Sequence, residues 1–148
     1  MSHLKLGALD GDDLAVISAH MQDAVMRVGD MKYLPKKQRF VILANRFNWD
    51  GAQTPEEGYQ RRRTGLHFNR IGSVRSSRIR NSAEESIVSL LNIEFRESEA
   101  PSGTIRLNFA GGGIIELEAE CVDAWLSDLG PEWGTGRMPE HDLEREAD

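Results

Sequence analysis

The sequence of 148 residues is poor in cysteine and in long apolar runs. Its single cysteine, Cys121, can form neither an intrachain disulfide nor a cysteine-based zinc site. The longest apolar stretches, such as "FVILA" at 40–44, are far too short to cross a bilayer. The sequence opens without a basic region followed by an apolar run, so we expect no signal peptide and a reducing, cytoplasmic location.

The sequence also lacks a recognisable catalytic or metal-binding constellation. The four histidines, His3, His20, His67 and His141, are scattered without metal-ligand spacing. Cys121 falls on the apolar face of a predicted strand, where a thiol is inert. We therefore expect no metal and no cofactor, and a non-enzymatic protein is favoured. An enzyme whose site assembles around His20 or His67 is the weakest alternative.

What is present favours one globular domain. Hydrophobic residues make up 39% of the sequence and charged residues 28%, a balance typical of folded chains. We predict a single domain over residues 1–131. The segment 132–148 is rich in glycine and then in acids, and we predict a loosely held tail there.

Apolar spacing predicts a helix first and strands afterwards. Leu14, Ile17 and Met21 share one helical stripe, so we predict a helix over about 13–23 with Asp12 or Asp13 as its N-cap. From Ala24 onwards the apolar residues alternate, and turns separate about seven short strands.

The clearest alternation lies in two consecutive segments. In "GTIRLNFAG" at 103–111 and "IIELEAEC" at 114–121, every second residue is apolar, which predicts an antiparallel hairpin with an acidic outer face. The glycines between the segments suit a tight turn. They form no phosphate loop, because no helix and no Lys-Ser/Thr pair follow them.

The segment "VDAWLSDLGP" at 122–131 returns to helical spacing, with Trp125 on the apolar stripe. We interpret it as a C-terminal helix that closes one mouth of a rolled, seven-stranded antiparallel sheet. This order of elements resembles a pleckstrin-homology-like barrel. The alternative is an open α+β sandwich with both helices on one face of the sheet.

Several segments resemble a bacterial family of small proteins known only as domain-of-unknown-function family 2948. They include "RRRTGLHFNRIGSVRS", "SLLNIEFR" and "GTIRLNFAGGGIIELEAECVDAWLSDLG". The resemblance covers about residues 4–131. It implies a single-domain, cytosolic bacterial protein, and it brings no activity, ligand or catalytic residue.

Charge is segregated along the sequence. Residues 27–80 carry thirteen bases against four acids, a net of +9, whereas residues 81–148 carry a net of −12. We consider two interpretations: a basic surface for an acidic partner, or complementary faces that meet within the fold or between subunits. The glutamates at 116, 118 and 120 form either a solvated face or a row that docks on the basic surface of a neighbouring subunit.

Residues 61–80 hold seven arginines and no acid. We predict two strands with a cationic outer side, and a binding or adaptor module that contacts an acidic protein or a second copy of itself. The predicted contact residues are Arg61, Arg62, Arg63, Arg75, Arg78, Arg80 and His67. Basic residues in the first hairpin turn form a secondary set: Lys36, Lys37 and Arg39. The alternative function is RNA or DNA binding through the same arginines, which the acidic pI of about 5.3 disfavours.

Overall fold

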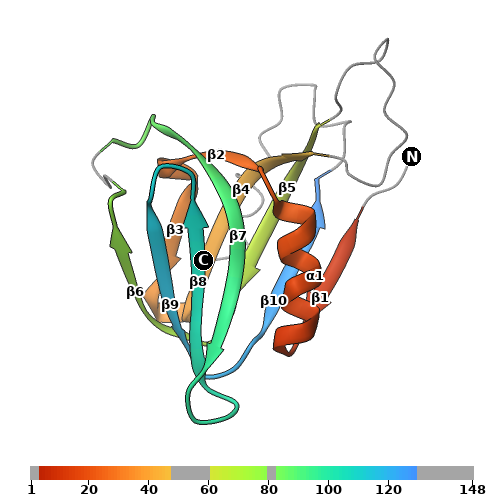
Figure 1. Cartoon of the computed structure of the whole chain (residues 1–148), viewed down its shortest axis with the longest axis vertical. Coiled ribbons are helices and arrows are strands. Elements are labelled where there is room, and N and C mark those ends of the chain that lie inside the picture. The colour runs from red at the N-terminus through yellow and green to blue at the C-terminus, as the bar shows by residue number, and fades with distance from the viewer. Residues whose placement is uncertain (1–3, 48–60, 80–82, 130–148) are drawn as a thin grey trace.

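The computed structural model describes residues 4–47, 61–79 and 83–129 as a mainly antiparallel β protein with one α-helix (Figure 1). Its strands are β1 (Lys5–Ala8), β2 (Val25–Arg27), β3 (Met31–Leu34), β4 (Arg39–Phe47), β5 (Arg61–Phe68), β6 (Ile71–Ser77), β7 (Ile87–Glu97), β8 (Gly103–Phe109), β9 (Ile114–Ala119) and β10 (Ala124–Asp128). The helix is α1 (Gly11–Met21), and two 3₁₀ turns, η1 (Val28–Asp30) and η2 (Pro35–Lys37), flank β3.

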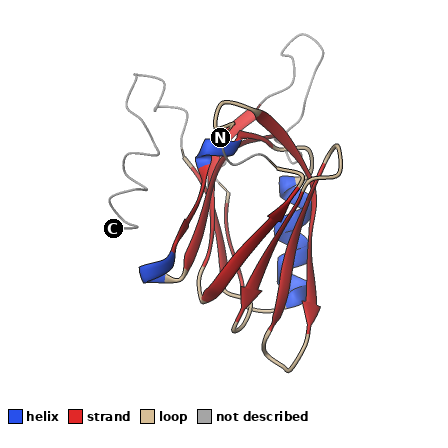
Figure 2. Cartoon of the chain, turned by 90° about the vertical axis from the view of Figure 1, so that its left-hand side faces the viewer, coloured by secondary structure: helices blue, strands red, loops and turns tan. Residues whose placement is uncertain are grey.

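The described strands form one open sheet in the order β1-β10-β5-β4-β2-β7-β8-β9-β6, with β3 paired to β4 beside β2. Figure 2 shows that the strands fall into two groups, with α1 beside one of them. The rolled sheet is therefore not closed, and the predicted seven-stranded, pleckstrin-homology-like barrel is not confirmed. The sheet is open, as in the alternative, but the described residues form ten strands and one α-helix.

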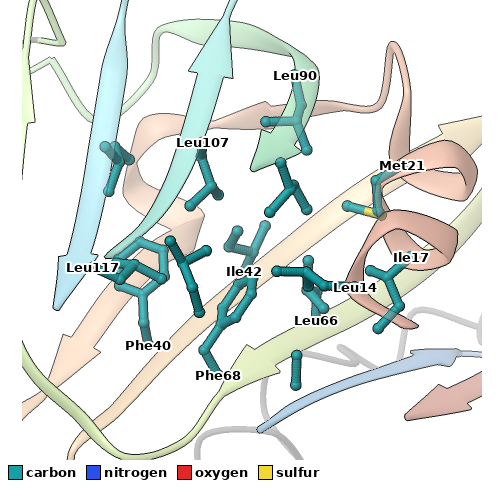
Figure 3. Close-up of a cluster of buried hydrophobic side chains, with 14 of the residues drawn as sticks. Leu14, Ile17, Met21, Phe40, Ile42, Leu66, Phe68, Leu90, Leu107 and Leu117 are labelled. Atoms are coloured by element: carbon teal, nitrogen blue, oxygen red, sulfur yellow. The ribbon is translucent and has the colours of Figure 1, made fainter. Parts of the chain in front are cut away.

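Helix α1 confirms the predicted apolar stripe. Leu14, Ile17 and Met21 are buried, and Figure 3 shows them beside Ile42 and Leu66 in the core. Burial of each such side chain contributes roughly 1.5–3 kcal/mol. These contacts hold α1 against the strands.

The predicted bounds of α1 were too late by about two residues. The N-cap is Asp10, whose carboxylate accepts a hydrogen bond from the Asp13 amide at 2.8 Å. Ser18 then ties the helix to the sheet, because its hydroxyl oxygen accepts a hydrogen bond from the Ile93 amide at 2.8 Å. The helix packs against β7 and β1.

The predicted C-terminal helix is wrong. Ala124, Leu126 and Asp128 point inward along β10, while Trp125 points outward and is 43% exposed. The Trp125 ring lies over Gly7 of β1, where a Cβ atom would collide with it. In so short a segment, the same apolar residues fit both a helical and an alternating pattern. The segment forms a strand because it pairs with β1 on one side and β5 on the other.

Two further corrections raise the number of strands to ten. The alternating run from Ala24 to Leu34 forms two strands, β2 and β3, because η1 divides it. The four residues of β1, before the helix, were not predicted at all. By contrast, the hairpin of β8 and β9 is confirmed, with buried and half-buried residues alternating along both strands. Gly111 and Gly112 in its turn have φ of 88° and 95°, which favours glycine.

Candidate binding surface

The structure divides the predicted arginine set between two separate strands. Arg62 and Arg63 lie at the start of β5, paired in register with Arg46 and Asn45 of β4. The other members lie on β6 or just after it, at the far end of the sheet order: Arg75 and Arg78. Figure 1 shows β6 at the left edge of the molecule and β5 behind its middle, so the two consecutive strands diverge from the short connection between them. The described arginines therefore do not form one patch; the side chain of Arg61 and all of Arg80 lie outside the described residues.

The β5 arginines are engaged within the fold. Arg63 lies 3.9 Å from the carboxylate of Asp30, and its side chain is only 27% exposed. Arg62 is half-buried on the inward side of the strand. His67 is half-buried on the outward side, in register with Trp125 of β10. This part of the predicted set offers little free surface to a partner.

The outward face of β6, β9 and β8 carries a network of opposite charges. An Arg75 guanidinium nitrogen lies 2.9 Å from Glu116 and 3.3 Å from Glu118, while Arg106 approaches Glu116 to 2.7 Å from the other side. These side chains stand in register across the three strands. The predicted row of glutamates therefore contacts arginines of the same chain. This is the interpretation in which complementary faces meet within the fold.

The network perturbs the acidity of its central carboxylate. Hydrogen bonding from Arg106 lowers the pKa of Glu116, and the charges of Arg106, Arg75 and Arg96 add to this against a smaller opposing effect of burial. A cavity of about 320 Å³ lies beside this carboxylate. Its lining combines Phe95 and Thr104 with five charged residues: Arg75, Glu94, Arg96, Arg106 and Glu116. The mixed signs of its lining make it a poor receptor for a ligand of one charge.

A second cavity lies in the gap between β3 and β6, which we call the seam. Its volume is about 300 Å³. Its lining residues come from both strands and from the segments around them: Val28, Gly29, Met31, Lys32, Tyr33, Phe40, Val74, Ser76, Glu84 and Ile115. The seam combines an apolar interior with two strand edges.

Hydrogen bonds fasten the seam at one end. The Tyr33 hydroxyl donates to the Ile71 carbonyl at 2.6 Å, and the Ile71 amide donates to the Gln38 carbonyl at 2.8 Å. Ile71 is the first residue of β6, so these bonds lie where that strand begins. The seam is therefore fastened at the Ile71 end of β6.

Exposed cations follow the seam. Lys36 and Lys37 of η2 lie at its fastened end, where η2 contacts β6. Arg75 lies midway along β6 with a side chain 68% exposed. Arg78 follows the end of β6, and its exposed side chain lies beside Gly112 of the β8–β9 turn, on the β9 side of the strand. Arg39, the third residue of the predicted basic turn, is instead half-buried, and its Nε donates to Asn69 at 2.9 Å.

Sequence reasoning missed a buried ion pair on the inner side of the sheet. Arg46 of β4 donates two hydrogen bonds to Asp128 of β10, at 2.9 and 2.6 Å, and their side chains are 2% and 0% exposed. The Leu4 amide also donates to Asp128, at 2.9 Å. Burial alone would raise the pKa of Asp128, but hydrogen bonds from Arg46 and Leu4 outweigh it, so the pKa is lowered. In a strand, Asp128 falls on the same inward face as Ala124 and Leu126, which would have indicated a buried carboxylate in need of a partner. The helical interpretation of this segment concealed that pattern.

The remaining candidate residues do not converge on a site. The sequence predicted Cys121 on the apolar face of a strand. The residue instead follows the end of β9 and is half-buried. His20 is half-buried on α1. Over residues 4–47, 61–79 and 83–129, no three His, Cys, Asp or Glu side chains are grouped so that they could hold a metal ion. In the same ranges, no helix is long and apolar enough to span a membrane.

The family model described as "Protein of unknown function (DUF2948)" matches residues 4–141, nearly the whole sequence. The chain belongs to this family. The match confirms the sequence resemblance and reaches ten residues beyond its expected limit. No curated protein and no solved structure matches the chain.

Proposed function

We propose that this DUF2948 protein is a non-enzymatic binding module that takes up an acidic segment of a partner protein along the seam. The observation that carries this proposal is the line of exposed cations beside an apolar-walled cavity. Lys36 and Lys37 lie in η2, which contacts β6 at the fastened end of the cavity. Arg75 lies between the lining residues Val74 and Ser76 on β6, and Lys32 of β3 lines the cavity itself. Clefts with apolar walls and a few charged groups at the rim are typical binding sites in proteins.

The distribution of charge supports an acidic partner. The β6 and η2 cations remain exposed, whereas Arg62, Arg63 and Arg39 are half-buried in the fold. Rim charges of this kind steer association and set the choice of partner more than they set the affinity. We therefore place the contact on Arg75 of β6 and on Lys36 and Lys37 of the basic turn, and leave Arg39, the β5 arginines and His67 out of it.

A binding titration tests the proposal. The probe is a fluorescent eight-residue peptide of alternating glutamate and valine, followed by anisotropy at low salt. The double variant Lys36→Glu/Lys37→Glu should weaken binding by roughly fivefold, since each exposed ion pair contributes about 0.2–1 kcal/mol. The loss should shrink as added salt screens the charges.

The matched control reverses one cation away from the seam. Lys5 is exposed on β1, at the opposite end of the sheet order from β6. Lys5→Glu alters the net charge as much as the single variant Lys36→Glu does, and it should retain most of the affinity. Equal losses in these two single variants would contradict a contact at the seam. Binding of an RNA oligonucleotide but not of the peptide would favour the nucleic-acid alternative instead.

A further inference from the structure

We propose that the partner segment binds as an added strand: it pairs with the free edge of β6 and lays alternate side chains into the seam cavity. This inference rests on the proposed function and specifies its geometry. The guest is an extended segment in which acidic and apolar residues alternate. Addition of a strand to an exposed sheet edge is a recurring mode of peptide recognition, in which backbone bonds give affinity and pockets give specificity.

The position of β6 provides the edge. In the part of the chain that the structure describes, β6 stands last in the sheet order and pairs with β9. Across the seam, β3 pairs with β4 alone among the described strands. Strand edges of this kind present backbone amides and carbonyls to any strand that approaches.

The pairing of β6 with β9 determines which backbone amides and carbonyls of β6 are directed towards β9 and which are directed into the seam. The Glu120 amide donates to the Arg70 carbonyl at 3.0 Å, so the backbone of Glu120 is turned towards β6. Backbone groups of an antiparallel strand alternate in direction, so Glu116 is turned towards its register partner Arg75 in the same way. The amides and carbonyls of Val74 and Ser76, on either side of Arg75, are then directed away from β9 and into the seam.

The same two residues contribute to the cavity wall. Val74 and Ser76 line the cavity from β6, and Met31 and Tyr33 line it from β3. A strand paired with β6 would place every second side chain over this wall, because side chains alternate between the faces of a sheet. Those positions suit small or medium apolar residues such as valine.

The intervening side chains would lie on the outward face. They would stand beside Arg75, which is exposed although it contacts Glu116 and Glu118. Carboxylates there would add acceptors for its guanidinium, and Lys36 and Lys37 lie towards the fastened end. The chemistry of the two faces thus specifies an alternation of acidic and apolar residues.

The fastened end fixes where the guest lies. At Ile71 the edge of β6 is occupied by the Gln38 carbonyl and the Tyr33 hydroxyl. The guest therefore runs beside Val74–Ser77, a length of roughly 13 Å at about 3.3 Å per residue. Three or four paired residues suffice to cover it.

Amide hydrogen exchange, followed by NMR on the whole protein, locates the guest directly. On addition of the alternating glutamate–valine peptide, exchange of the Val74 and Ser76 amides should slow at least tenfold. The Arg75 amide, which faces β9, should change much less. Slowed exchange elsewhere with no change at Val74 and Ser76 would overturn the added strand.

A pair of substitutions provides the second test. Ser76→Pro removes a backbone donor that faces the seam, and it leaves the donors that face β9 in place; proline is tolerated on strand edges of this kind. We expect it to weaken peptide binding at least fivefold. Ser76→Ala keeps the amide and should bind like the wild type. Thermal unfolding of both variants verifies that they are folded.

The outcomes separate this inference from the proposed function. Loss of affinity in Lys36→Glu/Lys37→Glu together with unchanged affinity in Ser76→Pro would refute the added strand and leave the acidic contact standing. Absence of peptide binding to the wild-type protein would refute both. A peptide with lysine in place of glutamate should bind at least tenfold more weakly, and equal binding would exclude charge recognition.

Discussion

Arg46 and Asp128 meet inside the sheet between β4 and β10, whereas Arg75 and Glu116 meet on its outward face between β6 and β9. Both contacts join a guanidinium to a carboxylate at less than 3 Å. Their surroundings differ: the inner pair is excluded from water, and the Arg75 side chain is 68% exposed. The same two chemical groups therefore have a structural role in one region and remain accessible to a partner in the other.

The difference is physical. A buried charge that loses its partner cannot recover its hydration, so breaking a buried pair is expensive even where forming it contributes little. An exposed arginine that loses its partner is immediately solvated, and salt screens what attraction remains. The inner pair should thus resist rearrangement, while Arg75 is able to exchange its glutamates for the carboxylates of a guest.

The largest effect is expected at the inner pair. Asp128→Ala leaves Arg46 buried without its carboxylate and should lower the free energy of unfolding by about 3–5 kcal/mol. Urea denaturation measures this as a lower midpoint at an unchanged slope. The double variant Arg46→Met/Asp128→Leu removes both charges and should recover most of the loss. A double variant as unstable as the single one would mean that the cost arises from packing.

Acidification sharpens the same comparison. The pKa of Asp128 is lower in the folded protein than its ordinary value of 3.8, so between the two values the unfolded chain binds more protons. Its stabilisation is therefore complete above about pH 5 and is lost as the pH falls through the folded-state value. Wild type should lose more stability between pH 5 and pH 2 than Arg46→Met/Asp128→Leu, as followed by urea midpoints. Parallel pH profiles of the two proteins would contradict this assignment.

The smallest effect is expected on the outward face. Arg75→Ala should lower the free energy of unfolding by less than about 1 kcal/mol, because both partners become solvated and Arg106 still holds Glu116. Thermal unfolding at low and high salt measures it, and 0.5 M salt should remove most of the difference. A loss as large as that of Asp128→Ala would erase the contrast between the regions.

Local patterns were sufficient to predict much of the fold. The stripe of α1 and the alternation of β8 and β9 each bury one face, so their sequences carry the signal in adjacent residues. The register shift at Gly72 was likewise visible, as a glycine interrupting an alternating run. In each case the residues that decide the structure lie within one element.

Other features depend on pairing between distant residues. Residues 124–128 suit either a helix or a strand until β1 and β5 lie beside them, and β1 itself is too short to recognise alone. A simple alternation would place Leu91 on the same face as Ile93, but a register shift between Leu90 and Asn92 leaves it exposed. No local pattern contains such information.

The candidate site shows the same division. The sequence predicted a cationic outer side for residues 61–80, and a meeting of acidic and basic faces was one of the two interpretations of the charge segregation. Which arginines remain on the surface depends on register: Arg75 stands opposite Glu116, while Arg63 lies near Asp30. The cavity could not be predicted, because it arises where two strands approach without pairing.

The Tyr33 hydroxyl has a consequence for how the molecule can deform. Where β6 begins, the Tyr33 hydroxyl joins that strand to β3, and the Ile71 amide joins it to Gln38 just before β4. The described residues contain no β-ladder between β3 and β6. Each such bond contributes a net of about 1 kcal/mol, so thermal motion can release this clasp while every neighbouring strand pair stays intact. Rupture of the hydrogen bond between Tyr33 and Ile71 would let β3 and β6 move apart along the seam.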